Sequence, residues 1–100
     1  MKLVWLEKAQ YDLRSIEAYY SDIASKEVSA KILQKIVKSA KIFLEQPYLG
    51  HLSEKDSNIL EWHIPTTFYT LVYQVINDEI QVLRVFHESQ NKPSKWEINC

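Results

Sequence analysis

The stretch "FYTLVYQVINDEIQVLRVFHE" (residues 68–88) has the pattern of two neighbouring β-strands. Residues 68–76 are rich in aromatic and β-branched side chains and are apolar on both faces, as expected for a central strand. Asn77 and Asp78 are typical of a tight two-residue turn. Residues 79–88 then return as the next strand. We therefore expect an antiparallel hairpin in the middle of a sheet.

A further strand is predicted immediately before this hairpin, in the segment "ILEWHIP". Its side chains alternate with a period of two, which is typical of a strand. Leu60, Trp62 and Ile64 share one face, whereas Glu61 and His63 share the other. The three strands together form a meander.

Two amphipathic helices are predicted in the first half of the chain. The apolar face of the first helix, which begins at about Glu7, comprises Ala9, Leu13, Ile16, Tyr20 and Ile23. Ser25 is a suitable N-cap for the second helix, and Glu27 lies in its first turn. The apolar face of the second helix comprises Val28, Ile32, Ile36, Ala40 and Phe43. Pro47 and Gly50 end it.

These elements predict an α+β fold. A short β-prone run, "KLVWL" (residues 2–6), provides an N-terminal strand. The two helices form an antiparallel hairpin that packs on one face of the sheet, and the polar segment 51–58 connects the hairpin to the meander. Pro93 discourages extension of the last strand. We find no repeat or linker, and residues 1–100 are predicted to form a single domain.

The composition excludes several functional classes. The chain has 100 residues and one cysteine, Cys100, so it has neither an internal disulfide nor a paired-cysteine zinc site. Gly50 is the only glycine, which excludes a P-loop and a dinucleotide fingerprint. The formal net charge of −1 does not indicate nucleic-acid binding. No run is long enough to span a membrane, and the protein is predicted to be soluble and cytoplasmic.

The lysines of the second helix form one candidate binding surface. Lys31, Lys35 and Lys38 recur at helical spacing. A stripe of this kind binds a phosphate backbone or an acidic partner, but most such stripes are solvated helix faces, and this second interpretation is favoured.

The histidines do not predict a metal site, and no cofactor is expected. His51, His63 and His87 lie in a loop and in two different strands, without the spacing of a ligand set. His87 ends a strand, where its imidazole is placed to act as a general acid or base. General-base catalysis also requires a nucleophile within hydrogen-bonding distance.

Arg84 lies among apolar neighbours on the last strand. In a regular strand Arg84 shares a face with Ile80, Val82 and Phe86, whereas His87 shares the other face with Leu83 and Val85. Arg84 and His87 therefore point to opposite faces, and only a β-bulge changes this. The favoured interpretation is a structural arginine that pairs with a carboxylate such as Glu61. Tyr69 and Tyr73 share a strand face, either in the core or along a groove. A stacking platform for RNA bases is the minority interpretation.

Several segments together resemble one family. "AQYDLRSIEAYY", "QPYLG", "EWHIPTTFYTLVYQV" and "IQVLRVFHESQNKP" are similar, in this order, to segments of the RelE/ParE superfamily of toxins from type II toxin–antitoxin modules. The motif "VLRVFH..Q..P" after a hairpin strand resembles the ParE-like branch. The family fold, two helices packed on a curved antiparallel sheet, agrees with the fold predicted from periodicity.

The resemblance implies two alternative activities. Ribonuclease members cut mRNA on the ribosome, and Arg84 and His87 match residues near their site. Two positions that carry arginine in similar sequences are Leu60 and Thr70 in this chain. A single histidine without positively charged side chains around it is poorly suited to catalyse phosphoryl transfer. ParE-like members instead bind and poison DNA gyrase and perform no chemistry of their own.

We therefore predict a ParE-like toxin that inhibits bacterial growth by binding DNA gyrase and contributes to plasmid stabilization. Its partner is a cognate antitoxin that lays an amphipathic segment over the helix hairpin and the sheet edge. His87, Gln90 and Trp96 belong to a recognition end. The remaining candidate contacts with target or antitoxin are Arg84, Tyr69, Tyr73 and the three lysines. The alternatives are an mRNA endoribonuclease with His87 as its catalytic residue, and a decayed toxin that only binds its antitoxin.

Overall fold

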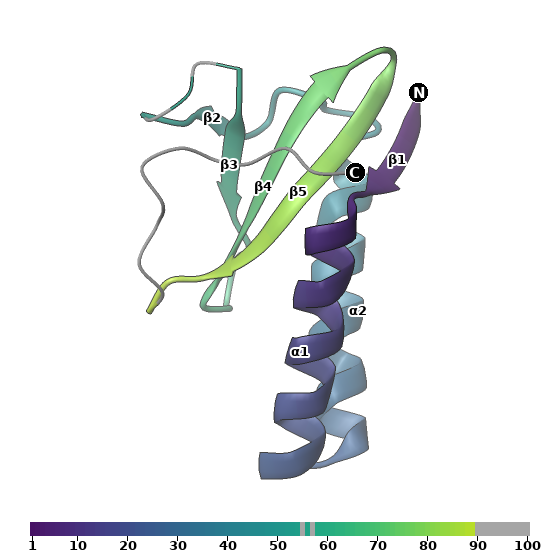
Figure 1. Cartoon of the computed structure of the whole chain (residues 1–100), viewed down its shortest axis with the longest axis vertical. Coiled ribbons are helices and arrows are strands. Elements are labelled where there is room, and N and C mark those ends of the chain that lie inside the picture. Colours follow the sequence, from purple (N-terminus) through teal and green to yellow (C-terminus); the bar gives the residue numbers. More distant parts are fainter. Residues whose placement is uncertain (55, 57, 90–100) are drawn as a thin grey trace.

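The computed structural model describes residues 1–54, 56 and 58–89. The chain begins with a strand, continues with two helices and ends in a series of strands (Figure 1). The elements, in chain order, are β1 (Lys2–Trp5), α1 (Glu7–Ile23), α2 (Lys26–Ile42), β2 (His51–Leu52), β3 (Leu60–His63), β4 (Tyr69–Ile76) and β5 (Glu79–His87).

The predicted α+β fold, with its N-terminal strand and two helices, is confirmed. The second helix begins where the sequence places its cap. The side chain of Ser25 accepts a hydrogen bond of 3.1 Å from the backbone N–H of Val28, which satisfies one of the unpaired donors at the helix start. Asn77 and Asp78 join β4 to β5 with φ angles of 52° and 58°, as a type I′ turn requires.

The five strands form one sheet in the order β1-β5-β4-β3-β2. β2, β3, β4 and β5 pair antiparallel, but β1 pairs parallel to β5, so the sheet is mixed rather than wholly antiparallel. A parallel pair needs a long connection between its strands, and the helix hairpin and the meander provide it between β1 and β5. The two-residue strand β2 lies in the segment expected to be a polar connection.

The pairing of β4 with β5 contains an irregularity at its centre. Tyr73 pairs with Val82 and Val72 pairs with Arg84, so Leu83 is an additional residue on β5. One extra residue on one strand is a β-bulge, which changes the direction of the side chains that follow it.

The bulge alters the predicted faces of β5. Ile80 and Val85 both belong to the main core between sheet and helices, whereas Leu83 and Phe86 belong to a smaller cluster with Leu6 and Ile59. The regular alternation, which puts Ile80 and Phe86 on one face, is therefore wrong beyond the bulge.

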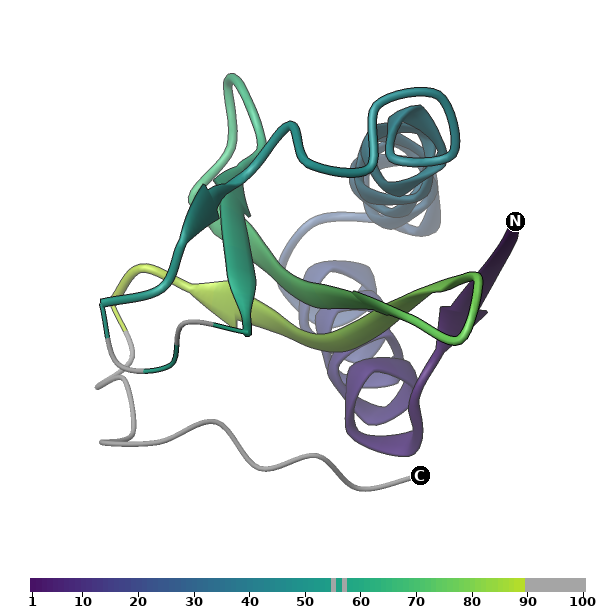
Figure 2. The same ribbon diagram turned by 90° about the horizontal axis from the view of Figure 1, so that it is seen from above.

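The main core lies between the helix hairpin and one face of the curved sheet (Figure 2). Phe43, at the end of α2, stacks on Tyr73 with ring centroids 3.9 Å apart and contacts Trp62 edge to face. Ile23 and Val28 were expected on the buried helix faces but are exposed. The reason is visible in Figure 1, where the end of the hairpin that joins α1 to α2 extends beyond the sheet.

Candidate functional site

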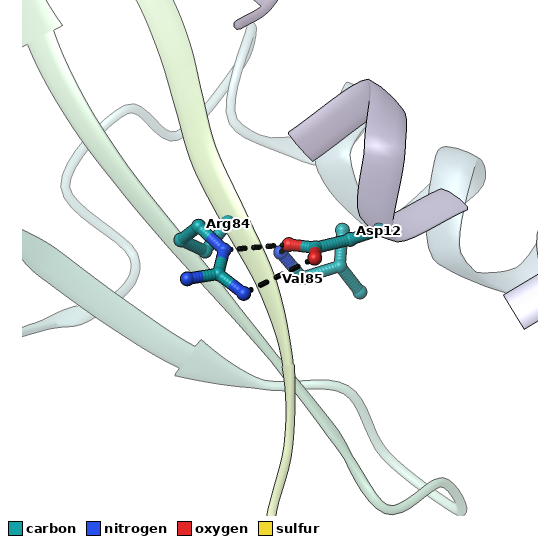
Figure 3. Close-up of polar contacts among 3 residues, drawn as sticks. All are labelled: Asp12, Arg84 and Val85. Atoms are coloured by element: carbon teal, nitrogen blue, oxygen red, sulfur yellow. Dashed lines mark hydrogen bonds and ion pairs between the residues drawn. The ribbon is translucent and has the colours of Figure 1, made fainter. Parts of the chain in front are cut away.

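Arg84 forms a two-pronged ion pair with Asp12, as Figure 3 shows. The Nε of Arg84 donates to one carboxylate oxygen at 2.8 Å, and one terminal nitrogen donates to the other at 3.1 Å. The first oxygen also accepts a 2.9 Å hydrogen bond from the backbone N–H of Val85. Asp12 is buried and Arg84 is half-buried. The interaction links α1 to β5 across 72 residues of sequence.

The position of Asp12 follows from the short length of β1. β1 pairs with β5 as far as Val82, and the N–H of Leu6 adds one bond to the carbonyl of Val82. Beyond that point the chain turns into α1, and the edge N–H of Val85 needs another acceptor. The carboxylate of Asp12 provides it. The structural interpretation of Arg84 therefore stands on this contact, and its ion-pair partner on α1 replaces the suggested Glu61.

His87 lies at the end of β5 among aromatic rings. Its ring centroid is 5.1 Å from that of Tyr69, in an edge-to-face arrangement, and 5.9 Å from that of Phe68. The backbone N–H of Ser89 donates to Nδ1 of His87 at 3.1 Å, and the hydroxyl of Ser89 lies 2.7 Å from the same nitrogen. An Nδ1 that accepts leaves the proton of the neutral ring on Nε2.

A groove runs past His87 between the end of α1 and the turn from β3 to β4. We call it the aromatic groove; its lining residues are Tyr19, Tyr20, Ile23, Phe68, Tyr69, His87, Glu88 and Ser89. Three of these residues have large apolar side chains that are exposed to solvent: Tyr19 is 57% exposed, Ile23 58% and Phe68 60%. Clustered exposed apolar side chains are typical of a protein-binding surface.

The aromatic groove is poorly equipped for acid–base chemistry. Burial, together with a hydrogen bond to Tyr20, raises the pKa of Tyr69 far above its ordinary value, so its phenol stays protonated at neutral pH. None of the residues that line the groove, within the part of the chain that the structure describes, is a lysine or an arginine. The groove therefore offers apolar contact and neutral hydrogen-bonding groups.

The three candidate lysines of α2 do not act on one site. Lys31 and Lys35 line a small pocket beside the turn from β3 to β4, and Nζ of Lys35 donates to Oγ1 of Thr66 at 2.9 Å. Lys38 instead lies with Lys41 along a separate depression on α2. The predicted stripe is therefore divided between two surfaces.

The remaining candidates are placed as follows. Tyr73 is fully buried, and its hydroxyl accepts a 2.9 Å hydrogen bond from the N–H of Gly50. Tyr73 was predicted to contact the target or the antitoxin. Its side chain lies in the core instead, where a partner cannot reach it. Gln90 and Trp96 lie outside the described residues. Leu60 is buried in the core and Thr70 is half-buried on β4.

The sequence patterns did not predict the role of Asp12 or the aromatic groove. Asp12 carried a signal, because it lies three residues after Ala9 and four before Ile16, which places a carboxylate within the apolar face of α1. A charge at such a position indicates a buried partner. Tyr19 and Phe68 carried no equivalent signal, since their exposure depends on how the turn meets the helix.

Two further findings concern residues 1–54, 56 and 58–89. No group of three or more histidine, cysteine, aspartate or glutamate side chains in these ranges is placed to hold a metal ion. No helix among them has the length and apolar character needed to cross a membrane.

The described residues form a small α+β fold with an exposed apolar groove. Residues 3–92 match the family model described as the ParE toxin of the type II toxin–antitoxin system, parDE, and the chain belongs to this family. It is thus a toxin of a type II toxin–antitoxin system, which implies a cognate antitoxin.

Comparison with solved structures agrees with this assignment. The chain is similar to a structure entitled "Chromosomal ParDE TA system from P. aeruginosa", with a TM-score of 0.78 and 27% sequence identity. The similarity covers 87% of this chain and 95% of the other. No curated protein matches the sequence.

Proposed function

We propose that this toxin arrests bacterial growth by binding DNA gyrase through the aromatic groove, without catalysing a reaction. The target comes from the resemblance to ParE-like toxins. The observation that favours binding over catalysis is the composition of the groove around His87. Phosphoryl transfer requires positive charge at the reacting phosphate. Among the described residues, the groove is lined by exposed apolar rings and one carboxylate, Glu88, instead.

The state of Arg84 also supports a binding mechanism. Arg84 is the cation nearest to His87 along β5, and its guanidinium is held by both oxygens of Asp12. A guanidinium that already forms a two-pronged ion pair must break that pair before it can stabilise a phosphate. The endoribonuclease alternative needs this rearrangement as well as a reactive His87.

The test is pulse labelling after induction of the toxin in a bacterial host without the antitoxin. Incorporation of labelled thymidine and of labelled amino acids is followed over the first minutes. An early fall in thymidine incorporation alone supports the gyrase target. An early fall in amino-acid incorporation supports the endoribonuclease alternative and contradicts the proposal. If neither falls, the chain is a decayed toxin.

Matched variants separate binding from catalysis. His87→Ala should reduce growth inhibition only modestly if the protein binds, and abolish it if His87 is catalytic. His63→Ala is the control, because His63 is the exposed last residue of β3. Tyr19→Asp and Ile23→Asp should abolish growth inhibition, because a carboxylate in an apolar interface is costly. Tyr48→Asp is their control, since Tyr48 is 72% exposed beyond the opposite end of α2.

A further inference from the structure

The aromatic groove holds five rings close together. We call them the ring cluster: Tyr19, Tyr20, Phe68, Tyr69 and His87. The ring centroids of Tyr19 and Tyr20 are 5.0 Å apart. The ring of His87 lies 5.1 Å from that of Tyr69 and 5.9 Å from that of Phe68. Because the face of an aromatic ring attracts a cation, several rings around one groove can bind a cationic group as well as an apolar one.

Phe68 is the most exposed ring of the cluster, and the backbone around it is fixed. Thr66, two residues earlier, has a φ of 63°, which is unfavourable for a β-branched residue. The N–H of Thr67 donates to the carbonyl of Ile64 at 3.2 Å, and the N–H of Glu88 donates to the carbonyl of Phe68 at 2.9 Å. Backbone strain is concentrated at binding and catalytic positions, and here it holds an exposed ring in place.

A carboxylate lies beside this ring. Glu88 lines the same groove as Phe68 and is exposed. Among the residues that the structure describes, no lysine or arginine forms an ion pair with Glu88. Asp12, which lines an adjoining hollow, differs in this respect, because Arg84 binds both of its oxygens. A ring with an available carboxylate next to it is complementary to a planar cation that donates hydrogen bonds.

A second carboxylate flanks the groove on α1. Asp22 is exposed and lies three residues after Tyr19, so the two side chains are on the same side of the helix. The lysines Lys31 and Lys35 line a separate pocket on the other side of Phe68. A basic group of a partner is therefore attracted to the groove and repelled beyond Phe68, which directs it to the ring cluster.

We propose that Phe68, Glu88 and the rings around them form a binding site for an arginine side chain of the target protein. The guanidinium lies on the ring of Phe68 and pairs with the carboxylate of Glu88, and apolar neighbours of that arginine contact Ile23. Arginine fits better than lysine, because a guanidinium is planar, stacks on aromatic rings and can present two N–H groups to one carboxylate. The inference rests on the proposed function, since the arginine belongs to the target.

The first test compares two synthetic peptides as probes of the purified full-length chain. One peptide is acetyl-Leu-Arg-Leu-amide. In the other, citrulline replaces the arginine, because it has nearly the same shape but no charge. NMR titration should show that the arginine peptide binds about threefold or more tightly and shifts the signals of Phe68 and Glu88. Glu88→Gln should remove this preference, and raising the salt from about 50 mM to about 300 mM should reduce it.

The second test measures binding of purified DNA gyrase to variants of the full-length chain. Glu88→Gln should weaken this binding about fivefold or more, because the guanidinium loses its charged partner. Glu45→Gln is the control, since it changes an exposed carboxylate just after α2, and it should alter the dissociation constant by less than about twofold. Phe68→Leu stays apolar but lacks a ring face and should weaken binding about threefold, whereas Phe68→Trp should bind as tightly as the unchanged chain.

Several outcomes would overturn the arginine site. Equal binding of the two peptides, or binding of neither, contradicts it. So does unchanged gyrase binding by Glu88→Gln, or an equal loss in Phe68→Leu and Phe68→Trp. Circular dichroism verifies that each variant is folded. Failure of the unchanged chain to bind gyrase contradicts the proposed target instead, and the peptide comparison then still decides whether the site selects a guanidinium.

Discussion

At the scale of single residues, the contact between Asp12 and Arg84 determines how α1 meets the sheet. One carboxylate oxygen serves both the guanidinium and the backbone N–H of Val85, which are adjacent on β5. The pair thus joins three polar groups where α1 packs against β5: the carboxylate, the guanidinium and the N–H of Val85. Arg84, which looked like a candidate site residue, is part of the scaffold that positions Val85 and the following residues.

The first prediction tests this contact. Asp12→Ala should lower the free energy of unfolding by about 2–4 kcal/mol, since it removes the carboxylate that accepts hydrogen bonds from the half-buried guanidinium and from the N–H of Val85. Asp12→Asn should cost less, because its amide oxygen still accepts from Val85. Urea unfolding followed by circular dichroism measures both values.

Glu17→Gln provides the control for Asp12, because it changes an exposed carboxylate on the same helix. Its unfolding midpoint should stay within error of the unchanged protein. If Asp12→Ala were equally stable, the ion pair would have no structural importance, and Arg84 would again be a candidate for binding.

The sequence correctly predicted the roles of single residues where these roles depend only on neighbours in the chain. Ser25 caps α2 because its hydroxyl reaches an N–H three residues away. Asn77 and Asp78 accept positive φ, which only few residue types do readily. Asp12 and Arg84 are 72 residues apart, and no local pattern indicates which carboxylate a strand arginine will meet.

At the scale of elements, both helices could be predicted because a period of 3.6 residues persists over four turns. The faces of β5 could not be predicted in full. Its first half follows strict alternation, but the bulge at Leu83 shifts the rest. Such a bulge has no fixed sequence signature here, because Val82, Leu83, Val85 and Phe86 are all apolar and fit either face of the strand.

The aromatic groove could not be predicted for the same reason. His87 follows the bulge in β5, and its contacts with Phe68 and Tyr69 depend on the direction that the strand takes there.

The second prediction concerns the turn from β3 to β4. Thr66→Gly should raise the free energy of unfolding by about 0.5–1 kcal/mol, because relief of the positive φ outweighs the lost bond to Lys35 and the greater freedom of glycine when unfolded. Thermal unfolding measures the change.

Thr67→Gly is the matched control for Thr66→Gly. The hydroxyl of Thr67 donates to the carbonyl of Ile64 at 2.8 Å and accepts from the N–H of Tyr69 at 3.1 Å. Its loss should therefore destabilise the protein. A lower stability of Thr66→Gly, similar to that of Thr67→Gly, would show that the positive φ stores little strain.

At the scale of the whole molecule, the parallel pairing of β1 with β5 closes the fold, because it joins the first residues of the chain to the last strand. Sequence patterns suggested a strand at 2–6 but not its neighbour, since a four-residue strand carries little information on its partner. Once β1 is beside β5, α1 must leave along the open edge of β5 (Figure 2). Asp12 and the aromatic groove follow from that path.

The core between sheet and helices also determines how stability depends on pH. Burial raises the pKa of both Tyr69 and Tyr73. Below about pH 10, the ordinary pKa of tyrosine, both phenols are protonated in the folded and unfolded chains, and they contribute no pH dependence. Above it the unfolded chain loses these protons first, so the free energy of unfolding falls as pH rises.

The third prediction follows from this sign. Between about pH 9 and pH 11 the free energy of unfolding should fall by on the order of 1 kcal/mol for each buried tyrosine. Tyr73→Phe lowers stability at every pH because the N–H of Gly50 loses its acceptor, but its decline with pH should be shallower than that of the unchanged protein. Tyr48→Phe, at an exposed position, should retain the full decline. Urea midpoints across this pH range measure the three slopes. Equal slopes in all three proteins would mean that Tyr73 ionises as easily in the folded core as in the unfolded chain, and that the contact between Phe43 and Tyr73 is looser than the structure indicates.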